Sequence, residues 1–192
     1  MRTTETDAVH DDDLARWDQD CGTQPDDHAS AIAPAPAAQR GPTTIRAATL
    51  ADVDTIVAMG LRFQATTSYA AHLRATAATL RTLAIGLVTN TDAAVILLLE
   101  DGAQVVGMLA ASLYVHPMSA EIIGTEVCWW VEPAARGGRG ALRLVRAAEA
   151  WARDRGAVVM QMMAPAGGDA DVGRFYEVLH YAPIETHYQR RL

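Results

Sequence analysis

Residues 131–156 read VEPAARGGRGALRLVRAAEAWARDRG, and the fold class follows from this stretch. It joins an apolar strand end to a glycine-rich turn and then to an arginine-rich helix. Apolar residues recur at three- and four-residue spacing between Leu142 and Ala152, which is the pattern of a helix with one buried face. Gly156 is placed to end that helix in a left-handed conformation. Because a further apolar segment follows, the stretch predicts two parallel strands joined by a right-handed helical crossover.

The turn before the helix has the composition of an anion-binding site. Gly137, Gly138 and Gly140 lack Cβ atoms, so the backbone can turn tightly and bring its amides close to a ligand. The first N–H groups of the helix add partial positive charge, and Arg136 and Arg139 add full charges. The turn is therefore predicted to bind a diphosphate. A surface helix entered through a flexible turn is the alternative interpretation.

Composition limits the classes of protein to consider. A chain of 192 residues, 50% of them hydrophobic, suits one domain with an appendage. The net charge of −7 lies mainly in residues 1–42, where nine acids and three arginines give −6; residues 43–192 hold 14 acids and 13 arginines. That near-neutral remainder argues against general nucleic-acid binding. All 16 basic residues are arginine, which excludes enzymes that need a P-loop, Schiff-base or other catalytic lysine.

Residues 1–42 are predicted to be a disordered tail, because they combine acidic clusters with an alanine–proline run and little apolar material. No apolar run is long enough to span a bilayer, and the polar start lacks the pattern of a secretory signal. Two cysteines, Cys21 and Cys128, suit a reducing compartment. We therefore expect a cytoplasmic protein whose ordered domain covers residues 43–192.

The periodicities of residues 43–192 predict an α/β (α+β) fold with a mixed sheet flanked by helices. Alternating or continuous apolar runs predict strands at residues 44–48, 93–99, 104–116, 121–131, 158–163 and 182–190. Besides the arginine-rich helix, helical spacing predicts helices at residues 49–60, 70–86 and 172–180. Residues 63–69 are expected to be irregular.

Two motifs resemble those of the GNAT superfamily of acetyl-CoA-dependent N-acetyltransferases. The family's first motif is V-x-P-x-x-R-G-x-G-x-G/A, and its matches here are Val131, Pro133, Arg136, Gly137 and Ala141. Arg139 stands where the family has glycine, so a slightly altered pyrophosphate loop is expected. The C-terminal motif is F/L-Y-E-x-x-G-F/Y, matched by Phe175, Tyr176, Glu177 and Tyr181. His180 replaces its glycine.

The resemblance implies a GNAT-like, mostly antiparallel sheet whose central parallel pair splays apart to hold the pantetheine of acetyl-CoA. The implied cofactor-binding residues are Trp129, Trp130, Val131, Arg136, Gly137, Gly138, Arg139, Gly140, Ala141 and Leu142. The first three bind pantetheine through backbone groups, and the amides of residues 137–142 bind the pyrophosphate. An amine then attacks the thioester directly in a ternary complex. An amide near Val131 stabilises the oxyanion, and Tyr176 protonates the departing thiolate.

The general base and the acceptor are less well defined by the sequence. A carboxylate is expected to take the proton of the amine; Glu126 is the first candidate and Glu121 the second. Either side chain could instead be a plain surface residue of a strand. The histidines His116 and His187 are weaker candidates. The resemblance implies that residues 61–70 and 116–120 read the acceptor, and neither segment has a telling cluster of charge.

Other enzyme classes lack their signatures in this chain. Arg143 stands where a dinucleotide fingerprint needs its third glycine, no G-x-S-x-G elbow occurs, and no His/Cys cluster has metal-ligand spacing. Two hypotheses remain. One is an N-acetyltransferase that acts on a small amine or peptide acceptor. The other is a catalytically silent GNAT-like module that binds acyl-CoA or a protein partner. Neither involves nucleic acid, a membrane or a metal, and a homodimer is left open.

Overall fold

The computed structural model describes residues 43–67, 70, 72–164 and 172–190. It divides into two compact units, and the described residues 43–164 belong to the larger one while residues 172–190 belong to the smaller one. The predicted disordered tail, residues 1–42, lies outside the described residues.

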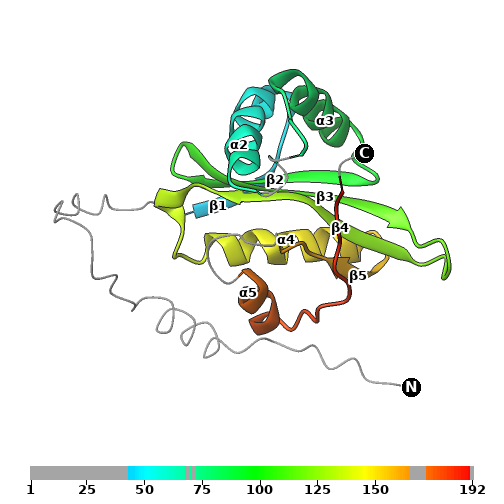
Figure 1. The fold of residues 1–192 in the computed structure, drawn as a ribbon. Helices are drawn as coiled ribbons and strands as arrows, with labels where there is room; N and C mark the ends of the chain where they lie inside the picture. Colours follow the sequence, from blue (N-terminus) through cyan, green and yellow to red (C-terminus); the bar gives the residue numbers. More distant parts are fainter. Residues whose placement is uncertain (1–42, 68–69, 71, 165–171, 191–192) are drawn as a thin grey trace, which may run out of the picture. The chain divides into compact units, whose positions relative to one another are not determined.

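The larger unit is built on a five-stranded sheet in the order β1-β2-β3-β4-β5 (Figure 1). The strands are β1 (Thr43–Ala47), β2 (Ala94–Asp101), β3 (Gln104–Val115), β4 (Ile122–Val131) and β5 (Ala157–Gln161). The first four pair antiparallel with their neighbours, and β5 runs parallel to β4. The prediction of a mixed, mostly antiparallel sheet with one parallel pair is confirmed.

Helices of the larger unit cover both faces of this sheet. They are η1 (Leu50–Asp52), α2 (Val53–Ala65), α3 (Ala77–Thr89), η3 (Pro133–Ala135) and α4 (Gly140–Asp154). Helices α2 and α3 lie on one face and α4 on the other (Figure 1). In the described ranges, no helix combines the length and apolarity needed to cross a membrane.

Each face of the sheet has its own apolar core. Under α2 and α3, the helical side chains Ile56 and Met59 pack in one buried cluster with Leu98 of β2 and Met108 of β3. Toward the other face, the fully buried residues of α4 are Leu144, Val145 and Ala148. The arginine-rich helix therefore buries one stripe, as its periodicity predicts, and Gly156 after it has a φ of 83°, the left-handed conformation expected at a helix end.

Two helix boundaries differ from the prediction. Helix α3 begins at Ala77 rather than at residue 70, because Thr76 is its N-cap: the Thr79 N–H donates to Thr76 Oγ1 at 3.1 Å. Such a cap satisfies an amide that has no partner within the helix. Helix α2 continues to Ala65, into the segment predicted to be irregular, and Phe63 packs partly against the core.

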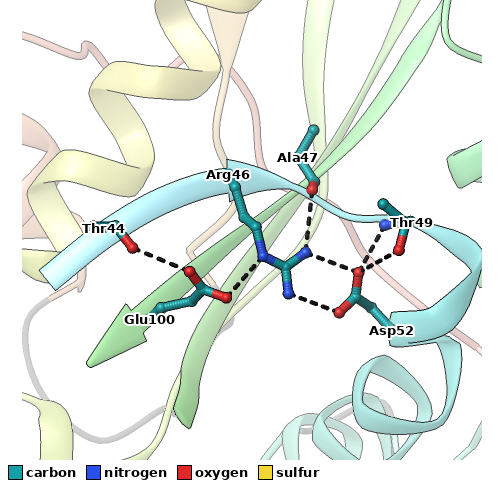
Figure 2. A network of polar contacts seen from close by, with 6 residues as sticks. All are labelled: Thr44, Arg46, Ala47, Thr49, Asp52 and Glu100. Atoms are coloured by element: carbon teal, nitrogen blue, oxygen red, sulfur yellow. Dashed lines mark hydrogen bonds and ion pairs between the residues drawn. The ribbon is translucent and has the colours of Figure 1, made fainter. Parts of the chain in front are cut away.

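A polar network fixes the entry to α2 against the sheet (Figure 2). Arg46 of β1 donates to both carboxylate oxygens of Asp52 at 2.8 Å and to Glu100 of β2 at 2.7 Å. Thr44 also donates to Glu100, and Thr49 donates to Asp52 through its N–H and its hydroxyl. The hydrogen bonds from Arg46 lower the pKa of both carboxyl groups, and those carboxylates raise the pKa of Arg46.

The smaller unit contains helix α5 (Val172–Val178), which confirms the predicted helix. The predicted strand at residues 182–190 is wrong, because residues 172–190 contain no strand. Pro183 has no N–H to give to a ladder. Ile184 and Tyr188 are 71% and 95% exposed, so the alternating pattern has no partner strand or core to pack against.

Candidate active site

The β4–β5 ladder ends halfway along β4. Its pairs run from Ile122 opposite Ala157 to Thr125 opposite Gln161, where β5 ends. Strand β4 continues to Val131, still paired with β3 along its other edge. We call the point after the Thr125–Gln161 pair the fork. Beyond the fork, this edge of β4 extends past its last ladder partner on β5.

A β-bulge determines which face of the sheet Glu126 lies on. Ala110 and Ala111 of β3 pair with Cys128 and Glu126, so Val127 is an extra residue on β4. Ladder partners share a face of a sheet, and an extra residue shifts the alternation by one. Cys128 therefore lies with Ala110 on the α2–α3 face, and Glu126 lies with Ala111 on the α4 face. Sequence alternation alone would have put the two on one face.

Glu126 is buried at the fork and bound to the chain after β5. Glu126 is only 5% exposed, and its Oε2 accepts a hydrogen bond from the Met163 backbone N–H at 3.1 Å. Burial, and to a lesser extent the charge of Glu126, raise the pKa of the Cys128 thiol to about 12. Since the thiolate is the nucleophilic form, Cys128 is not a nucleophile at neutral pH.

The glycine turn after β4 is shaped by two of its glycines for different reasons. Gly137 has a φ of 77°, a conformation that favours glycine. At Gly140 a Cβ would lie 2.5 Å from Leu99 Cδ2, so the absence of a side chain lets α4 pack closely on β2. Arg139, at the glycine position of the family motif, has a φ of −69°. That value is open to any residue, so Arg139 adds no backbone strain to the turn.

Arg136 is bound to the end of β4. Its Nε donates to the Val131 carbonyl at 3.0 Å, and its guanidinium carbon lies 4.8 Å from the centre of the Trp130 ring. The Trp130 side chain is buried, and within the described ranges its Nε1–H has no hydrogen-bond partner. Arg136 therefore connects the turn to the strand, although both it and Arg139 are exposed.

Glu132 attaches the start of the turn to two other elements. Its N–H donates to the Val106 carbonyl of β3 at 2.9 Å. Its Oε1 accepts from Arg62 Nη2 at 2.6 Å and from Arg62 Nε at 3.0 Å. Sequence reasoning missed this ion pair between α2 and the turn, because nothing in the local pattern of either segment points to the other.

Most of the predicted site residues lie in the larger unit. The larger unit brings together the end of β4 (residues 129–131), the turn and helix start (residues 136–142), and Glu126 at the fork. Tyr176 lies in α5 of the smaller unit, where its ring centre is 5.6 Å from that of Tyr181. Its role as general acid stays a prediction.

The remaining base candidates have ordinary surroundings. His116 and Glu121 flank the β3–β4 turn, where the His116 N–H donates to the Glu121 carbonyl at 2.8 Å. The His116 Nδ1 atom accepts from the Ser119 N–H at 3.3 Å. The side chain of His187 is 87% exposed. No group of His, Cys, Asp or Glu side chains within the described ranges could hold a metal ion.

A parallel strand pair that stops pairing along a strand leading into a glycine-rich helix start is the arrangement that the motif resemblance to acetyltransferases implies. The model of the Acetyltransferase (GNAT) family matches residues 63–181, more than half of the chain, and the protein belongs to that family.

Solved structures share the fold at low sequence identity. A transcriptional regulator from Bacillus halodurans C-125 is 21% identical with a TM-score of 0.65, over 79% of this chain and 100% of that one. A ribosomal-protein-alanine N-acetyltransferase from Brucella melitensis biovar Abortus 2308 is 18% identical with a TM-score of 0.61, over 79% and 99%. An aminoglycoside acetyltransferase from an uncultured soil metagenomic sample is 17% identical with a TM-score of 0.61, over 79% and 99%. A comparison with curated proteins found no match.

Proposed function

We propose that this protein is a cytoplasmic N-acetyltransferase that moves an acetyl group from acetyl-CoA to a primary amine by direct attack in a ternary complex. The observation that carries the proposal is the fork. There the ladder between β4 and β5 ends, a buried carboxylate lies beside the opening, and the continuing strand leads into the glycine turn. Family membership supports acetyl transfer. That the acceptor is a primary amine goes beyond what the family shows and is part of this proposal.

Strand β4 beyond the fork and the start of α4 offer backbone groups that suit acetyl-CoA. The β4 edge beyond the fork, residues 127–131, would hold the pantetheine through backbone hydrogen bonds. The amides of residues 137–142 at the start of α4 would bind the pyrophosphate, with the partial charge of the helix N-terminus in their favour. Exposed Arg139 would add a full charge. Arg136, bound to the Val131 carbonyl, would keep the turn in position. When bound, acetyl-CoA supplies the activated acetyl group.

Two side chains are proposed to move protons. Glu126 would accept the proton of the amine through water, since an alkylamine is mostly protonated at neutral pH. Its burial at the fork supports this role. Tyr176 would donate a proton to the thiolate, and the support for it is the motif match at residues 175–177.

A catalytically silent acyl-CoA-binding module is the second candidate. The observation in its favour is that the Glu126 carboxylate already accepts the Met163 N–H, as a purely structural side chain would. The Arg139 departure from the motif does not favour it, because Arg139 leaves the turn unstrained.

Calorimetric titration with acetyl-CoA, followed by thiol release with a panel of amines, tests the proposal. The wild type should bind acetyl-CoA saturably and release thiol only when an acceptor is present. Gly137→Ala should weaken binding, because a side chain is strained at a φ of 77°. Gly86→Ala is the matched control, since nothing lies within 4 Å of its Cβ either and its φ is not positive. Saturable binding without acetylation of any amine would favour the silent module.

A further inference from the structure

Four uncharged polar side chains lie together at the fork. The sheet register places Ser112 of β3, Thr125 of β4 and Gln161 of β5 side by side across three strands. Tyr114 follows Ser112 on the same face of β3, and its hydroxyl donates to Gln161 Oε1 at 3.1 Å. We call these four residues the polar row.

The polar row lies on the open face of the sheet at this point. Met108 and Ala110, which alternate in step with Ser112 and Tyr114, belong to the core under α2 and α3. Farther along β3 that cover ends. Tyr114 is 38% exposed and Val159 of β5, on the same face, is 50% exposed, whereas Ile123 between them is buried. A molecule in solution can therefore reach the row at its Tyr114 end.

The opposite face of the sheet is closed at the same level. A Cβ at Gly124 would lie 2.8 Å from Met160 Sδ and 3.0 Å from Ala152 Cβ of α4. Helix α4 thus packs directly on β4 next to the fork and leaves no room for an acceptor. An amine held by the polar row therefore reaches the fork from the α2–α3 face, and its proton reaches Glu126, which lies on the α4 face, past the end of the β4–β5 ladder.

The row presents a defined set of hydrogen-bonding groups. Because the Tyr114 hydroxyl donates to Gln161 Oε1, the amide of Gln161 is oriented and its Nε2 has two N–H donors to offer. Within the described ranges this nitrogen makes no hydrogen bond. The hydroxyl of Ser112 can donate and accept, whereas that of Thr125 already donates to the Glu126 carbonyl at 3.3 Å and offers its oxygen as an acceptor. No member of the row is charged, so a second ammonium or a carboxylate on the acceptor would lose water there without an ionic partner.

We propose that the polar row recognises the acceptor, and that the acceptor is an amine flanked by uncharged hydroxyl or amide groups. The proposal rests on the proposed acetyl transfer at the fork. It makes Tyr114 and Gln161 specificity-determining residues, and it argues against polyamines and acidic amines as the preferred acceptors.

Initial rates with glucosamine, glycinamide, spermidine and glutamate test the proposal, with acetyl-CoA affinity measured separately by calorimetry. The wild type should prefer glucosamine or glycinamide. Tyr114→Phe should lower kcat/KM for the preferred acceptor roughly 3- to 10-fold, as expected for one lost hydrogen bond, and leave acetyl-CoA affinity unchanged. Gln161→Glu should raise the ratio of kcat/KM for spermidine to that for the preferred amine by about 10-fold or more, because it adds a charged partner. Gln104→Glu, which adds the same charge at the exposed start of β3, should leave that ratio as in the wild type.

Several results would overturn this inference. They are a wild-type preference for spermidine or glutamate, acetylation of other amines of the panel but of none of these four, or variants at both positions with the wild-type acceptor profile. Absence of acetyl-CoA binding, or binding without acetylation of any amine, would instead overturn the proposed function itself, so the two failures are distinguishable.

Discussion

Replacing Glu126 by glutamine separates two roles that the structure allows for this buried side chain. Oε2 of Glu126 accepts the Met163 backbone N–H, and glutamine keeps a carbonyl oxygen for that hydrogen bond. Glutamine cannot take a proton from an amine. If Glu126 is the general base, we expect Glu126→Gln to fold and to bind acetyl-CoA normally, with kcat/KM for the acceptor lower by roughly 10²–10⁴.

Replacing the same residue by alanine gives the stability scale for comparison. Alanine removes the acceptor of the Met163 N–H at a partly buried position. A polar group left without its partner costs about 1–3 kcal/mol, so Glu126→Ala should lower the free energy of unfolding by that amount. Glutamine exchanges a charged acceptor for a neutral one and should lower it by about 1 kcal/mol or less.

Three measurements on wild type and both variants decide between the roles: urea denaturation, calorimetric titration with acetyl-CoA, and initial rates of thiol release. A glutamine variant with wild-type kcat/KM would refute the assignment of Glu126 as base and leave it as a structural contact. Glu121→Gln would then be assayed as the second candidate. Equal loss of stability in the glutamine and alanine variants would refute the hydrogen-bond argument.

Four further predictions concern stability and reactivity. Gly140→Ala should lower the free energy of unfolding by about 1–3 kcal/mol, because its methyl group would lie 2.5 Å from a buried leucine side chain. Gly86→Ala, which places its methyl group in open space, should raise the free energy of unfolding by about 0.5–1 kcal/mol. Urea denaturation measures both. His180 has a φ of 64°, so His180→Gly should stabilise the chain by roughly 1 kcal/mol in the same assay. The hydrogen bonds that lower the pKa of Asp52 stabilise the fold above about pH 4 and are lost as the pH falls below it; Asp52→Asn should flatten that loss in denaturation series from about pH 7 to 3. Because its pKa is raised to about 12, Cys128 should resist alkylation at about pH 8 in the native state and react on unfolding, as mass spectrometry would show.

The strand–turn–helix unit around the glycine turn could be predicted because its signals are local. Apolar periodicity, glycines and a terminal Gly156 act within a few residues of one another, and the structure has the helix where they place it. The strand predicted at residues 182–190 failed because alternation says which side chains share a face, not whether a partner strand exists. Helix α3 was started too early because leucine spacing outweighed the cap at Thr76.

In the candidate site, too, local features could be predicted from the sequence and features that depend on strand pairing could not. The turn residues could be assigned from their composition, and Arg139 was expected to alter the loop because a motif does not give backbone angles. The face on which Glu126 lies depends on the bulge at Val127, which is a property of the pairing with β3 rather than of β4 alone. The contact between Tyr114 and Gln161 joins residues of two strands that are not neighbours in the sheet, so no local pattern could reveal it.

The sheet has its strands in the order in which they occur along the chain. Each new strand therefore finds its partner already synthesised as the chain leaves the ribosome, and the sheet can grow one strand at a time from β1. Strand β5 arrives last, after α4 has crossed over β4, and only then does the fork exist. A nascent chain that stalls before β5 would present the apolar edge of β4 along its whole length, a surface prone to pair with other chains. The fork is thus the last part of the described sheet to form, and its formation covers the first part of the β4 edge, residues 122–125.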